Sequence, residues 1–255
     1  MFDRIRKTVR PLTNVARALV DTVYAPALFW LGGRRANALV GRRQEPGGAG
    51  LSPSPLEIHF DAHQDGAGLW KWRHYFDIYH AHFSRFQGRK PKIVEIGVYS
   101  GGSLEMWRNY FGEDCEYFGV DINPVCRRYE APGVTIKTAD QSDRSFWRAF
   151  RQEVGEVDII IDDGGHRPRQ QRPTFEEMLR CIKPGGVYLC EDMHGLRNPF
   201  TAYLRGFANS LNADRFTPAQ AWVKSVTFYP YVTVVEMLDR PRAELVSEKR
   251  GDIWI

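Results

Sequence analysis

Two apolar segments of the chain, residues 157–161 and 186–190, each run directly into a pair of acidic residues. The segment between them has the length of one helix, so the two runs are predicted to be neighbouring parallel strands joined by a crossover. Both acidic pairs then emerge at the carboxyl edge of the sheet, where open α/β folds bind ligands. Carboxylates gathered there repel one another unless a cation or hydrogen bonds compensate. We therefore interpret this edge as a functional site.

The same strand-and-helix alternation extends to both sides of this unit. It favours parallel pairing with right-handed crossovers, and two further strand patterns near the C-terminus flank Tyr229-Pro230 as an antiparallel hairpin. The predicted class is α/β, a Rossmann-like open and mostly parallel sheet with helices on both faces. Strands are predicted at residues 92–96, 116–120, 134–138, 157–161, 187–190, 221–228 and 231–238, and helices at 69–86, 103–111, 145–154, 169–182 and 200–211.

Composition and charge suggest two parts of unequal size. The 255 residues, 43% of them hydrophobic, suffice for one sizeable core. Residues 1–43 hold nine Arg or Lys against two Asp, whereas the whole chain has a net charge of +4. Residues 44–55 are rich in Gly, Pro and Ser and are typical of a linker. We predict a basic arm and linker at 1–55 and one domain at 56–255.

The basic arm has the pattern of a helix that lies on an anionic membrane surface. Its apolar stretch, residues 19–31, is interrupted by Asp21 and Pro26 and is too short to span a bilayer. The alternative is an arm that packs on the body of the protein or on a partner subunit, and we expect a homo-oligomer. Four cysteines without a CxxC pair indicate a reducing cytoplasm. The predicted location is cytoplasmic, with peripheral contact at the inner membrane surface through residues 1–43, and no nucleic-acid partner is expected.

Residues 69–86 are an aromatic segment with apolar residues at helical spacing. We expect one helix that covers the edge of the sheet. The segment also carries His74, His80 and His82, which are expected on its polar face rather than as metal ligands.

A glycine-rich turn follows the first predicted strand. The turn, from Gly97 to Gly102, is neither the dinucleotide fingerprint nor a P-loop, because Tyr99 interrupts the first and no Lys completes the second. Asp121 at the tip of the next strand could accept the hydroxyls of a ribose. Asp140-Gln141 after the third strand could meet an adenine edge. The combination predicts a nucleoside-containing cofactor.

These motifs resemble the class I S-adenosylmethionine-dependent methyltransferase domain. More narrowly, the sequences Glu-Ile-Gly-Val-Tyr-Ser-Gly-Gly-Ser-Leu from Glu95, Asp-Asp-Gly-Gly-His from Asp162 and Glu-Asp at 191–192 resemble the macrocin- and mycinamicin-type sugar O-methyltransferases. That group also resembles proteins named rhamnosyl O-methyltransferases and cephalosporin hydroxylases. The likeness covers about residues 69–195. It implies S-adenosyl-L-methionine as cofactor, bound by Glu95, Gly97, Tyr99, Ser100, Gly102, Ser103, Asp121, Asp140, Gln141 and Asp162.

The resemblance also implies a metal ion and a general base. Asp163, Glu191 and Asp192 would hold Mg²⁺, and His166 would take a proton from an acceptor hydroxyl. The implied acceptor is a small glycosylated molecule. The chain departs from the family pattern at residues 193–200, a loop expected to contact this acceptor.

Several alternatives to these residue roles stay open. His166 could cap backbone groups at a helix entry, and the Glu-Asp pair at 191–192 could be an N-cap. Glu95 could be an ion-pair partner, and Tyr99 could pack on the following helix. At the level of function, the alternatives are a hydroxylase-like enzyme of the cephalosporin hydroxylase type and a non-catalytic, membrane-recruited accessory protein.

Overall fold

A computed structural model of the chain describes residues 25–36, 38, 40 and 52–251. The chain divides into two units, residues 1–51 and 52–255. In the first unit, residues 25–36 are helical, and the Arg34 guanidinium lies 4.6 Å from the centre of the Trp30 ring. Much of the predicted basic arm and most of the predicted linker lie outside the described residues. Within the described ranges, no helix combines the length and the apolar character needed to cross a membrane.

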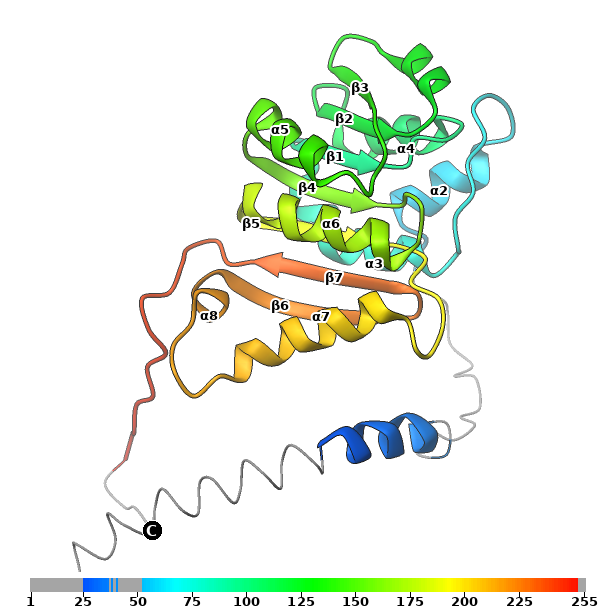
Figure 1. Cartoon of the computed structure of the whole chain (residues 1–255). Coiled ribbons are helices and arrows are strands. Elements are labelled where there is room, and N and C mark those ends of the chain that lie inside the picture. The colour runs from blue at the N-terminus through cyan, green and yellow to red at the C-terminus, as the bar shows by residue number, and fades with distance from the viewer. Residues whose placement is uncertain (1–24, 37, 39, 41–51, 252–255) are drawn as a thin grey trace, which may run out of the picture. The chain divides into compact units, whose positions relative to one another are not determined.

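The second unit is built on a seven-stranded sheet in the order β3-β2-β1-β4-β5-β7-β6, which Figure 1 shows from β3 to β6. The first five strands pair in parallel, and the last two are antiparallel to their neighbours. The strands are β1 (Lys92–Ile96), β2 (Glu116–Asp121), β3 (Val134–Thr138), β4 (Val157–Asp162), β5 (Ile182–Cys190), β6 (Val223–Tyr229) and β7 (Val232–Met237).

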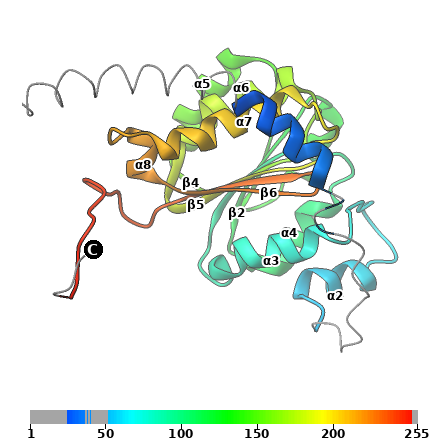
Figure 2. The same ribbon diagram turned by 90° about the horizontal axis from the view of Figure 1, so that it is seen from below.

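Helices cover both faces of this sheet, as the view in Figure 2 shows. On one face lie α5 (Arg144–Val154), α6 (Pro168–Met178) and α7 (Pro199–Asn209), and on the other lie α3 (Tyr75–Phe83) and α4 (Gly102–Phe111). The remaining described helices of this unit are short: α2 (Pro55–Ala62), α8 (Pro218–Trp222) and the 3₁₀ turns η1 (Ser84–Phe86), η2 (Pro124–Tyr129), η3 (Leu179–Cys181) and η4 (Ser210–Asn212).

The central strands are apolar on both sides because each side meets a helix layer. In β4, Ile159 and Ile161 belong to the core under α3 and α4, whereas Ile160 belongs to the core under α5 and α6. Successive side chains of a strand point to opposite faces, so an uninterrupted apolar run is the expected sequence of a strand buried twice. Acidic residues appear where these apolar runs end, at Asp162 in β4 and at Glu191 after β5.

The strand order places a crevice between β1 and β4. From β1 the chain proceeds through β2 to β3 on one side, and it then returns to β4 and β5 on the other. At such a switch point the connections leave in opposite directions, and the space outside the carboxyl ends of the strands stays open for a ligand. The predicted neighbouring, parallel arrangement of β4 and β5 is confirmed, as are the α/β class and the C-terminal hairpin.

Three expectations about local structure were wrong. The predicted helix at 69–86 begins only at Tyr75, and residues 69–72 are not helical. The predicted helix at 169–182 ends at Met178, because η3 follows and β5 already begins at Ile182. His82 is buried rather than on a polar face; its Nε2 lies 2.9 Å from the Tyr229 hydroxyl, and Glu236 also contacts its ring.

Candidate active site

A cavity of about 420 Å³ opens at the carboxyl ends of β1, β2, β4 and β5. Its lining comes from the segment before α3, from the glycine-rich turn after β1, and from the tips of β2, β4 and β5. Segments that are far apart in the sequence thus meet at the crevice that the strand order predicts.

The glycine-rich turn is held against the strand tips by close backbone approach. Gly97 has φ of +92°, and a Cβ at this position would lie 2.1 Å from the carbonyl oxygen of Asp163. Only glycine fits such a position. The turn therefore brings the backbone of the first strand loop into direct contact with the first acidic pair.

Asp121 organises the same turn from the tip of β2. One carboxylate oxygen accepts the backbone N–H groups of Val98 and Tyr99, at 2.9 and 3.0 Å, and the other accepts that of Asn123 at 2.8 Å. Asp121 lines the cavity. Tyr99 also lines it, with a positive φ of 48° and 81% of its surface exposed, so it does not pack on the following helix.

Glu95 lies below the cavity and does not line it. The side chain is fully buried and accepts hydrogen bonds from Ser103 Oγ and Trp107 Nε1, both at 2.9 Å, and from the Tyr117 hydroxyl. Burial raises the pKa of Glu95, while the nearby Lys71 ammonium and the donors Tyr117 and Trp107 lower it. Glu95 therefore holds three side-chain donors beneath the turn, whereas Ser100, Gly102 and Ser103 line the cavity.

The residues after β3 and at the end of β4 form a second network. Gln141 lines the cavity, donates to Asp162 at 2.6 Å and accepts the backbone N–H of Gly165 at 2.8 Å. Asp162 is fully buried, and burial raises its pKa to about 7 against the hydrogen bonds from Tyr188 and Gln141. Asp140 is outside the cavity lining, where it accepts from Ser142. Asp140 and Asp162 therefore do not face the cavity.

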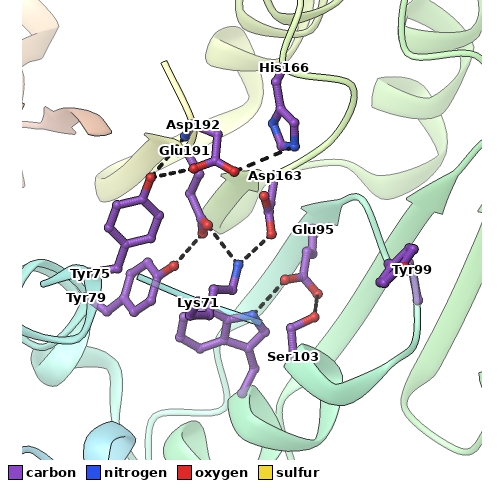
Figure 3. A network of polar contacts seen from close by, with 12 residues as sticks. Lys71, Tyr75, Tyr79, Glu95, Tyr99, Ser103, Asp163, His166, Glu191 and Asp192 are labelled. Carbon is purple, nitrogen blue, oxygen red and sulfur yellow. Dashed lines mark hydrogen bonds and ion pairs between the residues drawn. The ribbon is translucent and has the colours of Figure 1, made fainter. Parts of the chain in front are cut away.

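Three side chains at the edge of the cavity are arranged like metal ligands. Asp163, His166 and Asp192 each offer one ligand atom, and these atoms lie within 4.8 Å of one another. Carboxylate oxygens are the donors that Mg²⁺ prefers. His166 has a φ of 52°, and its Nε2 lies 3.7 Å from Asp192 Oδ2. Arg167, the N-cap residue of α6, makes no side-chain capping hydrogen bond. The His166 ring faces Asp192 (Figure 3).

Glu191, which the resemblance assigns to the metal, is held in a different way. Lys71 Nζ lies 2.8 Å from Glu191 Oε2 and 2.5 Å from Asp163 Oδ2, and the Tyr79 hydroxyl donates to Glu191 Oε1 at 2.7 Å (Figure 3). Burial lowers the pKa of Lys71, but the surrounding carboxylates outweigh it and raise the pKa, so the ammonium stays charged. The additional hydrogen bonds, from Lys71 to Asp163 and from Tyr79 to Glu191, offset part of the cost of burying this ion pair.

Residues 94–193 match the family described as a methyltransferase domain. Residues 94–193 therefore correspond to a methyltransferase domain. The chain is also 35% identical over 182 residues to the 8-demethyl-8-alpha-L-rhamnosyl tetracenomycin-C 2'-O-methyltransferase of Streptomyces olivaceus, over 69% of this chain and 43% of that relative. The mycinamicin VI 2''-O-methyltransferase of Micromonospora griseorubida is 34% identical over 136 residues, over 51% of this chain and 32% of that relative.

The chain thus spans less than half the length of these curated relatives. Among solved structures, the MycE methyltransferase in complex with Mg, SAH and mycinamycin VI superposes with a TM-score of 0.61 at 22% identity. The match covers 74% of this chain and 54% of that one. At this identity the likeness establishes the fold.

Sequence reasoning missed three residues that contact the acidic pairs. They are Lys71, Tyr75, whose hydroxyl donates to Asp192 Oδ1 at 2.7 Å, and Tyr79. In the predicted helix at 69–86, the helical spacing marks both tyrosines as apolar residues and gives no sign of a polar contact. A signal for Lys71 was present, since a charged residue between Trp70 and Trp72 interrupts an otherwise apolar stretch.

Proposed function

We propose that this protein transfers a methyl group from S-adenosyl-L-methionine to a hydroxyl of a sugar on a small glycosylated molecule, with the help of Mg²⁺. The observation that carries the proposal is one shared cavity. It joins the glycine-rich turn and Asp121 to the cluster of Asp163, His166 and Asp192. A donor and an acceptor bound at the two ends of this cavity would meet between them.

The cofactor end of the cavity supports a nucleoside. Each carboxylate oxygen has two lone pairs, so Asp121 retains acceptor capacity beyond the backbone N–H groups that it already binds. Ribose hydroxyls are donors that can use this capacity. Gly97 and Gly102 of the turn line the cavity without a side chain, and Tyr99 lines it with most of its surface exposed. S-adenosyl-L-methionine can therefore approach the backbone of the turn closely, and the Tyr99 ring is placed to close over it.

The acidic end of the cavity supports metal-assisted deprotonation. A sugar hydroxyl is a poor nucleophile at neutral pH, and a bound Mg²⁺ would lower its pKa. Asp163 and Asp192 would hold the ion, which fits their oxygen donors and separation. His166 lies beside them and would accept the proton at Nε2, the nitrogen that faces Asp192. Methyl transfer is an in-line displacement, so the cavity would also have to hold the acceptor oxygen close to the methyl carbon of the cofactor.

An aromatic cluster beside Asp192 supports a sugar acceptor. The ring of Trp72, which lines the cavity, lies 5.6 Å from that of Tyr231 and 6.2 Å from that of His194. His194 Nε2 is 3.4 Å from Asp192 Oδ1. Exposed ring faces bind the apolar C–H face of a sugar, while hydroxyls turn to polar groups. The relatives named above act on rhamnosyl tetracenomycin and on mycinamicin VI, which are compounds of this class.

The proposal is tested with S-adenosyl-L-methionine whose transferable methyl group carries three deuterium atoms. Methyl transfer to a panel of plant and bacterial glycosides is measured by mass spectrometry with and without Mg²⁺. We expect a 17-dalton gain on a sugar hydroxyl for the wild type and none for Asp163→Asn. Cofactor binding in the absence of any methylated glycoside would instead favour the non-catalytic alternative. A hydroxylated product would favour the hydroxylase-like one.

We further propose that the protein is a cytoplasmic homo-oligomer that contacts the inner membrane surface through residues 1–43. The described helix at 25–36 supports the membrane contact, because the apolar side chains of Leu28, Phe29 and Trp30 are all more than half exposed. The four cysteines are buried free thiols, which fits a reducing compartment.

Co-sedimentation with anionic vesicles tests the membrane contact: binding that survives deletion of residues 1–43 contradicts it. Sedimentation equilibrium tests the oligomer.

A further inference from the structure

Glu191 already has a donor on each of its carboxylate oxygens. Lys71 Nζ occupies Oε2 at 2.8 Å, and the Tyr79 hydroxyl occupies Oε1 at 2.7 Å. The carboxyl group is 1% exposed and Lys71 is 3% exposed, measured on their side chains. A divalent cation that reached Glu191 would have to displace one of these buried partners.

The other two carboxylates present a different arrangement. Lys71 takes only Oδ2 of Asp163, at 2.5 Å, and Tyr75 and His194 both approach Oδ1 of Asp192. Oδ2 of Asp192 faces His166. Among the described residues, Oδ1 of Asp163 therefore accepts no hydrogen bond, and Oδ2 of Asp192 has only the His166 ring nearby, at 3.7 Å, which is beyond hydrogen-bond distance. The exposed side of the acidic cluster is where a cation can approach.

Lys71 is placed by a segment that does not belong to the strand tips. The neighbouring Gly68 packs so closely on α4 that a Cβ at Gly102 would lie 2.5 Å from its carbonyl oxygen. On the other side of Lys71, the chain turns into α3, from which Tyr79 donates to Glu191 and Tyr75 donates to the adjacent Asp192. The ammonium is thus inserted between the tips of β4 and β5 by an independently anchored support (Figure 3).

We propose that Lys71 is the resident counter-cation of this site: it holds Glu191 and one oxygen of Asp163, and a divalent cation binds beside it to the outward oxygens of Asp163 and Asp192. Lys71 is a positioning residue, since it acts through the carboxylates. Its charge repels the incoming ion, and its hydrogen bonds keep Glu191 out of the ligand set. This inference rests on the metal site of the proposed function.

Isothermal titration of Mg²⁺ and Mn²⁺ into the full-length protein at pH 8 tests the proposal without any turnover. We expect Glu191→Gln to bind the cation within about threefold of the wild type. Lys71→Met should bind it at least tenfold more tightly, because the repulsion is removed and Glu191 becomes available. In the double variant Lys71→Met/Glu191→Gln, much of this gain should be lost, since the two residues are coupled. Lys71→Arg, which keeps the charge, should resemble the wild type.

The outcomes separate this proposal from the proposed function. Loss of cation binding in Glu191→Gln, or unchanged or weaker binding in Lys71→Met, overturns the role of Lys71. If the wild type binds no cation but Lys71→Met does, Lys71 is the counter-cation and the metal-assisted reaction is rejected. Binding by neither rejects both. Unfolding of each variant is followed by circular dichroism, and Lys71→Arg supplies the folded comparison if Lys71→Met does not fold.

Discussion

Asp121 and Tyr99 are joined across two neighbouring strands: the carboxylate of Asp121 at the tip of β2 accepts the backbone N–H of Tyr99 in the turn after β1, at 3.0 Å. The adjacent N–H of Val98 points to the same oxygen. One carboxylate thus sets the shape of the turn and is also an acceptor at the cavity wall. The loop geometry and the binding of a ribose would depend on the same side chain.

Asp121→Ala should therefore weaken S-adenosyl-L-methionine binding by at least about 30-fold, because charged-acceptor hydrogen bonds contribute about 1.5–3 kcal/mol each. Titration calorimetry measures the dissociation constant. Asp143→Ala is the matched control, since Asp143 caps α5 through Ser145 away from the cavity and its loss should not alter binding. Equal affinity of Asp121→Ala and the wild type contradicts the placement of the cofactor.

His166→Asn should lower kcat by about 10²–10⁴-fold, the usual contribution of a general base. Asn is chosen because it tolerates the positive φ of 52° at this position. Cofactor affinity should be unchanged, since His166 lies at the acidic end of the cavity. Steady-state kinetics measures kcat, and titration calorimetry measures the cofactor affinity. If kcat is unchanged in the variant, another group accepts the proton.

Trp72→Ala should raise KM for a glycosylated acceptor about tenfold with little change in kcat. Stacked rings contribute about 0.5–1.5 kcal/mol beyond the area they bury, and the contact would be made equally in the ground and transition states. Trp222→Ala is the control, because Trp222 is 43% exposed, comparable to 47% for Trp72, but does not line the cavity. Steady-state kinetics on both variants distinguishes an acceptor platform from an exposed aromatic surface.

Glu236→Gln should destabilise the fold at neutral pH by about 3 kcal/mol, since it removes one member of a largely buried ion pair. His82, and Arg85 at 2.7 Å, hold the pKa of Glu236 well below its usual range. A lowered pKa in the folded state stabilises above the pKa of the unfolded chain, and this stabilisation is lost as the pH falls. Urea unfolding should therefore show the difference at pH 7 and a smaller one below about pH 4.

The exposed pair of Glu116 and Lys92 provides the reference for that experiment. Their charged atoms lie 3.3 Å apart, and the Glu116 side chain is 51% exposed. Glu116→Gln should cost less than about 1 kcal/mol at either pH, as exposed pairs do. A pH-independent loss in Glu236→Gln would mean that its packing, rather than its charge, stabilises the hairpin.

Local patterns sufficed to predict the sheet and the acidic strand tips. A strand buried on both faces must be apolar along its length, so β4 and β5 are visible as apolar runs, and the point where each run ends in carboxylates is visible as well. The glycine-rich turn and Asp121 follow from the same logic, because positive φ and close backbone approach restrict the residue type. These features depend on neighbours in the sequence.

Local sequence patterns place these residues at the edge of the sheet, whereas the partner that each of them binds depends on how distant elements pack. Lys71 is 92 residues from Asp163 and 120 from Glu191, and its place between them depends on how the segment before α3 crosses the crevice. Likewise, His82 became buried through partners on the C-terminal hairpin. Such contacts arise from the packing of whole elements, for which a local pattern carries no signal.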